Sequence, residues 1–223
     1  MASKQVKIIN NHFMKLNKIS VILAVTSLLL FSSCGKKTTP TITPTPTPEL
    51  VELKLDQKPF ISLTPSADGH EINLKISEIS NVIKEIDYEL VYDAGSVGTE
   101  IQKGVNGTIK VDGSTALKNI LLGTESCTNG CKRKYDEGVT GGNLILNFRA
   151  PPNQAVSFET PFALKTTAEI KKTGSLSLEG FSIKPKTTLT GSQFFIIMKN
   201  FQDNGYSVFS NGQNSLVGNY PAQ

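Results

Sequence analysis

After residue 50 the chain alternates apolar and polar side chains over short runs, which Gly, Asn, Asp and Ser separate. The clearest runs are residues 51–55, 70–76 and 86–92. Such alternation places one face of an extended chain in a core and the other in water, as in a half-buried β-strand. Less regular runs predict further strands at residues 59–63, 107–111, 117–122, 143–149, 155–164, 175–183 and 193–199.

Turn-forming dipeptides lie between these runs, among them Asp68-Gly69, Asn106-Gly107, Asp112-Gly113 and Asn204-Gly205. Many short strands joined by such turns are typical of an antiparallel sandwich or barrel. We therefore predict an all-β, immunoglobulin-like antiparallel β-sandwich over residues 50–223. No stretch after Cys34 has a helical period, and residues 77–84 are expected to form one short turn between strands.

A possible sub-boundary lies near residues 150–173, where Ala150-Pro151-Pro152-Asn153 interrupts the pattern. The favoured interpretation is a prolyl turn within one domain. The alternative is that residues from Thr173 onward form a second small β unit.

The N-terminal pattern differs from that of the rest of the chain. An apolar run at residues 21–31 follows Lys15 and Lys18 and precedes the small residues Ser32 and Ser33. This is the order of a secretory signal peptide, with a charged segment, an apolar segment and a small-residue cleavage site. The run is shorter than the ~20 residues that span a bilayer as a helix. We therefore expect residues 1–33 to be removed, with an uncleaved membrane helix or a non-lipoprotein secretory signal as alternatives.

Phe31-Ser32-Ser33-Cys34 resembles the lipobox of bacterial lipoproteins over about residues 14–34. The resemblance implies that Cys34 is diacylated and becomes the mature N-terminus. The protein would then be anchored to a bacterial cell membrane, with its domain facing outside the cytoplasm. Phe31 departs from the Leu, Val or Ile that this family usually has there. Met14 starts a more usual leader than Met1, so the true start is expected at Met14.

Residues 38–48 are a Thr/Pro tract. Proline fixes φ and removes hydrogen-bond donors, so the tract favours an extended spacer of about 3.1 Å per residue, roughly 35 Å in all. Residues 34–49 are therefore expected to be a disordered linker that lifts the domain away from the membrane.

The formal net charge of +4 is confined to the leader. Lys4, Lys7, Lys15 and Lys18 precede Cys34 and no acidic residue does, so the mature chain has 19 basic and 19 acidic residues. The longest run of like charge in it is Lys132-Arg133-Lys134. Without a basic stripe to neutralise phosphates, nucleic acid is not an expected partner.

Cys127 and Cys131 are the two cysteines that remain after Cys34. In an exported protein, two cysteines this close usually form a disulfide, and the intervening Thr128-Asn129-Gly130 forms turns readily. A zinc site would need four thiol or imidazole ligands, and His70 is the only other one in the mature chain. The disulfide is thus favoured over a metal or redox site.

Catalytic patterns are scarce. His70, the only histidine available as a general base, precedes a predicted strand and is expected to be an exposed surface residue. No nucleophile elbow or phosphate-binding loop is present. Asp136-Glu137 is the most suggestive pair of acids for a glycosidase. Solvated turn residues are the favoured interpretation, and the chain has no Trp to form a sugar platform.

Calcium is the other ligand we considered, because oxygen-rich loops often bind it in exported β domains. Asp136 and Glu137, or Asp93 with Glu100, are candidate ligands, but no Asp-x-Asp-x-Asp-Gly loop is present. No cofactor is expected.

Two functions from different classes remain. The first is a non-catalytic binding or adhesion module that contacts an extracellular protein or glycan through loops or an exposed sheet edge. The second is a structural or accessory envelope lipoprotein without a ligand of its own. A carboxylate-based glycosidase is a distant third. Ser80-Asn81-Val82, followed by Tyr88-Glu89-Leu90-Val91-Tyr92-Asp93, is similar to cohesin-like and related cell-surface sandwich domains.

Overall fold

The computed structural model describes residues 51–96, 98–128 and 130–222. The predicted signal segment, Cys34 and the Thr/Pro linker lie outside the described residues. The described part of the chain is an all-β sandwich with one short helix, as the alternating pattern predicted. No helix in it is long and apolar enough to cross a membrane.

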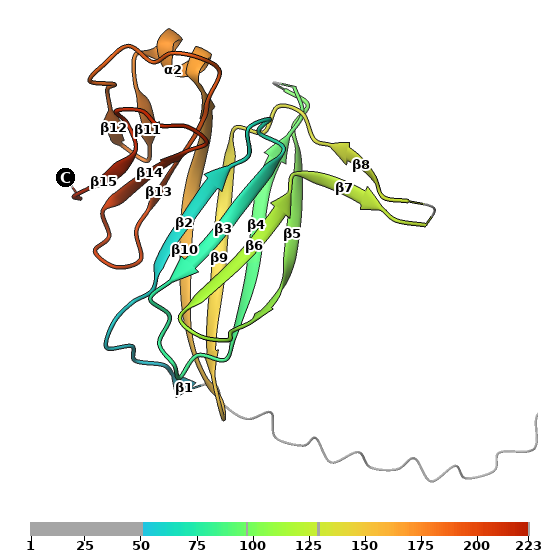
Figure 1. Cartoon of the computed structure of the whole chain (residues 1–223), viewed down its shortest axis with the longest axis vertical. Helices are drawn as coiled ribbons and strands as arrows, with labels where there is room; N and C mark the ends of the chain where they lie inside the picture. Colours follow the sequence, from blue (N-terminus) through green and yellow to red (C-terminus); the bar gives the residue numbers. More distant parts are fainter. Residues whose placement is uncertain (1–50, 97, 129, 223) are drawn as a thin grey trace, which may run out of the picture. The chain divides into compact units, whose positions relative to one another are not determined.

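An eight-stranded sheet forms one layer of the sandwich (Figure 1). Its order is β15 (Gly218–Tyr220), β14 (Tyr206–Ser210), β13 (Phe194–Lys199), β10 (Gln154–Thr166), β9 (Gly141–Ala150), β4 (Glu85–Ala94) and β5 (Ile101–Lys110). The eighth strand, β1 (Val51–Glu52), pairs with the start of β10 in parallel, whereas the other pairings are antiparallel.

The second layer is a three-stranded antiparallel sheet that lies in front of β4, β9 and β10 in Figure 1. Its order is β2 (Phe60–Pro65), β3 (Glu71–Ser77) and β6 (Thr115–Leu121). Inward-facing side chains of both layers form one buried cluster, to which Leu74 contributes from β3 and Leu146 and Phe148 from β9. The alternation in the sequence therefore separates this core from the outer faces.

Residues 151–153 join β9 to β10, and the two strands pair directly from Ala150 and Gln154 onward. The Pro-Pro break is thus the turn of a long hairpin. At the far end of β10 the chain continues into a helix, α2 (Thr167–Thr173), whose N-cap is Thr166.

A second buried cluster covers the opposite face of β13 and β14. Along β13, Ile196 and Met198 belong to the first cluster, whereas Phe195 and Ile197 belong to the second. Ile170 of α2 and the hairpin of β11 (Leu176–Leu178) and β12 (Phe181–Ile183) pack on this second face. β13 is a continuous apolar run because both of its faces are covered.

Several expectations about elements were wrong. Asn106-Gly107, expected to be a turn, lies inside β5, and β14 was not among the predicted strands. α2 is a helix after Cys34, where none was expected. The single strand predicted at residues 175–183 is the β11–β12 hairpin, with Glu179 and Gly180 at positive φ between its strands. The strand predicted at residues 51–55 extends only over Val51–Glu52.

Candidate functional site

A two-stranded hairpin projects from the sandwich beyond the end of β6 (Figure 1). It consists of β7 (Gly123–Ser126) and β8 (Lys132–Tyr135), which pair antiparallel with each other in a sheet of their own. The described side chains of residues 124–135 are exposed. We call residues 123–135 the arm. Sequence analysis did not predict its strands.

The predicted disulfide between Cys127 and Cys131 closes the tip of the arm. Glu125 lies within 4.8 Å of the two sulfur atoms, and these three residues are the one group of three potential metal ligands among the described residues. Cysteine binds zinc as a thiolate. Because the two sulfur atoms are bonded to each other, this group is not a zinc site in the oxidised protein.

The two faces of the arm differ in how their charges are paired. Cross-strand partners share a face, so Glu125 and Arg133 lie on one face, and Thr124 with Lys134 and Ser126 with Lys132 lie on the other. Arg133 forms ion pairs with Glu125 at 2.7 Å and with Glu71 of β3 at 2.8 Å. The arginine face is therefore neutralised and tied to the sandwich.

An aromatic contact reinforces this attachment. The rings of His70 and Tyr135 stack with their centroids 4.2 Å apart. His70 is half-buried between β2 and β3, rather than fully exposed as the sequence suggested. Its packing partner explains its position without any role in acid–base chemistry.

Asp136 forms the base of the arm. Its side chain is 7% exposed and pairs with Lys103 of β5, and it accepts a hydrogen bond of 2.9 Å from the Tyr92 hydroxyl of β4. The Asp136 backbone N–H donates to the Leu122 carbonyl at 2.9 Å. One side chain thus joins the end of the arm to two strands of the large sheet.

The surroundings of Asp136 and Tyr92 determine which of the two side chains is charged. Burial alone would raise the pKa of Asp136, but hydrogen bonds from Lys103 and Tyr92 outweigh burial and hold the pKa below its ordinary value. Burial and the neighbouring carboxylate raise the pKa of Tyr92. The neutral tyrosine therefore donates to an ionised aspartate.

The structure separates the side chains of Asp136 and Glu137, which the sequence offered as a pair. The Asp136 carboxylate is buried against Lys103 and Tyr92, whereas Glu137 is exposed and its backbone carbonyl accepts from Gly95 N–H at 2.8 Å. Asp136 is thus not the solvated turn residue that the sequence favoured. Neither this pair nor Asp93 with Glu100 belongs to a three-ligand group among the described residues.

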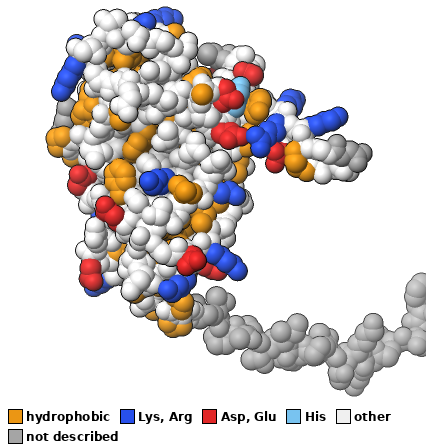
Figure 2. All heavy atoms as spheres, in the orientation of Figure 1, with side chains coloured by type: hydrophobic (Ala, Val, Ile, Leu, Met, Phe, Trp, Pro, Cys, Tyr) orange, Lys and Arg blue, Asp and Glu red, His pale blue; other side chains and the backbone are white. Residues whose placement is uncertain are grey.

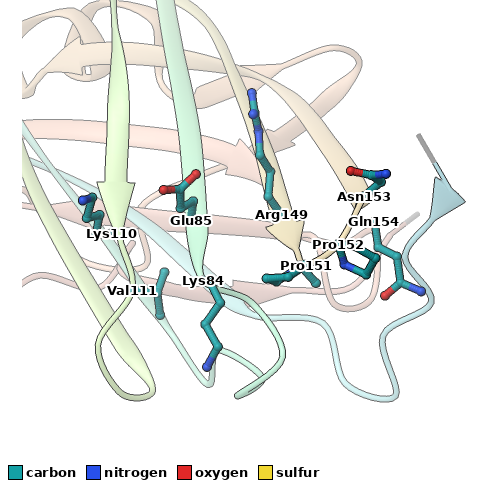
Figure 3. Close-up of a pocket in the computed structure, with 10 residues that line it drawn as sticks. Lys84, Glu85, Lys110, Val111, Arg149, Pro151, Pro152, Asn153 and Gln154 are labelled. Carbon is teal, nitrogen blue, oxygen red and sulfur yellow. The ribbon is translucent and has the colours of Figure 1, made fainter. Parts of the chain in front are cut away.

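A separate hollow of about 610 Å³ lies at the end of the sandwich where β9 turns into β10 (Figure 3). Lys84, Lys110 and Arg149 contribute to its lining. Arg149 pairs with Asp87, and the Lys84 ammonium donates to the Asn81 carbonyl at 2.7 Å. Figure 3 shows Lys84 and Arg149 pointing to opposite sides, so these cations do not converge on one ligand.

We compared the chain with known protein families, curated proteins and solved structures. No family model, no curated protein and no solved structure matches the chain.

Proposed function

We propose that this protein is a lipoprotein anchored at Cys34 whose β-sandwich is a non-catalytic binding module, with the arm as its contact element. The supporting observation is the arm itself, a disulfide-closed hairpin with exposed side chains that is fixed to the sandwich at its base. The arm contributes no side chain to either buried cluster. Stability of the core therefore gives no reason for it to project into solvent.

The contacts at the base of the arm hold the hairpin in one orientation, which favours a role in binding. Asp136 and Arg133 hold two sides of the hairpin against β3, β4 and β5 through ion pairs and the Tyr92 hydrogen bond. A contact element that is held in one orientation before binding loses less conformational entropy when it meets a partner. A protein or glycan outside the cytoplasm is the class of partner that this arrangement serves.

Two other functions compete with this proposal. A structural envelope lipoprotein would need the anchor and the sandwich, but not an exposed, braced hairpin. A glycosidase acting through Asp136 and Glu137 would need one carboxylate free to donate or accept a proton. The Asp136 carboxylate is instead engaged by Lys103 and Tyr92.

The test compares the full-length chain with an arm-shortened variant, in which an Asn-Gly turn replaces residues 124–134. We expect labelled wild-type protein to bind cell-envelope fractions saturably, and the shortened variant to lose at least tenfold of that binding. Lys171→Ala with Lys172→Ala, on the exposed surface of α2, is the matched control and should bind like wild type. Equal binding by the shortened variant would contradict the proposal, as would glycoside turnover that Glu137→Gln abolishes.

A further inference from the structure

The face of the arm that is not tied to the sandwich carries unpaired positive charge. Lys132 and Lys134 are exposed there beside the hydroxyls of Ser126 and Thr124. Among the described residues neither lysine has an ion-pair partner. Figure 2 shows Lys and Arg side chains gathered on the arm. No apolar side chain lies on this face, so the surface that complements it is acidic and polar.

The same chain has an acidic surface on the outer face of its large sheet, the face turned away from β2, β3 and β6. The second buried cluster covers the β13–β14 half of that face. On β4, in the other half, Ile86, Tyr88, Leu90 and Tyr92 point into the core. The alternate residues Glu85, Asp87, Glu89, Val91 and Asp93 therefore lie on the outer face.

The partners of these acids show how much negative charge remains. Asp87 pairs with Arg149 and accepts a hydrogen bond of 2.7 Å from the Thr108 hydroxyl. Glu89 and Asp93 are exposed, and neither has an ion-pair partner among the described residues. The residues opposite them on β5 are Asn106 and Gln102, which are uncharged, whereas Glu85 lies between Lys110 of β5 and Arg149 of β9. We call Glu85, Asp87, Glu89 and Asp93 the acidic row.

The two surfaces are complementary in charge, although their spacing differs. Alternate residues of an antiparallel strand are about 6.8 Å apart, so Lys132 and Lys134 are one such interval apart, whereas the unpaired acids Glu89 and Asp93 are two intervals apart with Val91 between them. No ion pair joins the arm lysines to the acidic row within the described part of one chain. Each copy therefore presents two unpaired lysines on the arm and two unpaired acids, Glu89 and Asp93, that are available to another copy.

We infer that the lysine face of the arm docks on the acidic row of a second copy of this chain. This inference rests on the proposed role of the arm as a contact element and names its partner. The contact joins different surfaces of the two copies, so it is head-to-tail and extends to a ring or an open row. Each exposed ion pair contributes only about 0–1 kcal/mol, so association in solution is weak and falls with salt. Copies confined to one membrane meet at a high effective concentration, which favours their association.

Photo-crosslinking of the full-length chain in detergent tests the contact directly. Ser126, which lies on the lysine face, is replaced by p-benzoylphenylalanine. We expect a covalent dimer whose crosslinked peptide comes from residues 85–110. Its yield should drop several-fold as salt rises from about 50 mM to about 500 mM. Crosslinks to other regions of the second copy, or no dimer, would overturn the inference.

Charge reversal provides the matched test. One variant carries Lys132→Glu and Lys134→Glu, and the other carries Glu89→Lys and Asp93→Lys. Each variant alone should give at least tenfold less crosslinked dimer. Mixing the two variants should restore the yield, because the reversed charges of one complement those of the other. Lys171→Glu with Lys172→Glu changes the net charge equally and should leave the yield unchanged. Failure of the mixture to restore the dimer would contradict the contact.

The dimer yield and the envelope binding test the self-association and the proposed binding function separately. If the dimer is absent but envelope binding still depends on the arm, this inference fails and the proposed function stands. If both are absent, both fail.

Discussion

At the residue scale, Asp136 determines how the arm meets the sandwich. Its carboxylate is 7% exposed, whereas Lys103 remains 38% exposed. Removing one partner of a fully buried ion pair costs about 3–5 kcal/mol. Since Lys103 retains access to water, we expect Asp136→Asn to lower the free energy of unfolding by less, about 2 kcal/mol. Urea denaturation at pH 7 measures this value.

Glu137→Gln is the control, because Glu137 is exposed and next in the chain. Its effect should stay within about 0.5 kcal/mol, as is usual for surface substitutions. Equal effects of the two variants would show that the Asp136 ion pair does not stabilise the fold.

The same residue makes stability depend on pH. The pKa of folded Asp136 lies below the ordinary value of 3.8, so its ionised form stabilises the fold above that value. This contribution is lost as the pH falls through the pKa of the folded state. The stability difference between wild type and Asp136→Asn should therefore shrink between about pH 5 and about pH 2. Glu169 and Asp68 also have lowered pKa values, but they are present in both proteins and cancel. A difference that is constant with pH would contradict the assignment.

At the scale of elements, the arm is closed by a disulfide across a very short loop. Closing so short a loop removes little entropy from the unfolded chain. We expect the Cys127→Ser, Cys131→Ser double variant to fold, with a loss of stability at or below about 2 kcal/mol. Thermal unfolding of both proteins gives the comparison, and thiol labelling should require prior reduction of the wild type. Stoichiometric labelling without a reductant would show that the native cysteines are free.

Strands with a long apolar–polar alternation, such as β3 and β4, were predictable, whereas the short β14 and the strands β7 and β8, which lack an apolar face, were not. β3 and β4 alternate apolar and polar residues because the first cluster covers one side. β7 and β8 project into solvent, so their sequences have no apolar face for alternation to reveal. α2 is only seven residues long, too short for a helical period. Its signal was the capping box from Thr166 to Glu169, which the structure contains.

The base of the arm shows a second limit of sequence analysis. The Cys127–Cys131 pair is local, and its spacing indicated the disulfide. Lys103 and Tyr92 lie 33 and 44 positions before Asp136, and the pairing of β4 with β5 brings them beside it. No pattern in one sequence indicates which lysine such a fold places beside a given aspartate.

At the scale of the whole molecule, the proposed membrane attachment depends on one side chain. Expression in a bacterial host with labelled fatty acid should label the wild-type chain. Cys34→Ala should abolish the label, because the acyl groups are attached through that thiol. Cys131→Ser is the control that removes another thiol and should leave the label unchanged. Label that persists in Cys34→Ala would contradict lipidation at this position.

The position of β1 has a mechanical consequence. β1 pairs with the start of β10, whereas the base of the arm lies near the other end of β4, so residues preceding Val51 and the arm attach at opposite ends of the sheet. A pulling force between them would act along the strands and load the β1–β10 hydrogen bonds in shear. That pairing includes the Val51 N–H to Asn153 and Leu53 N–H to Ala155 bonds, of 2.9 and 2.8 Å. Tension would therefore detach this short strand first, while the two-layer core stays folded.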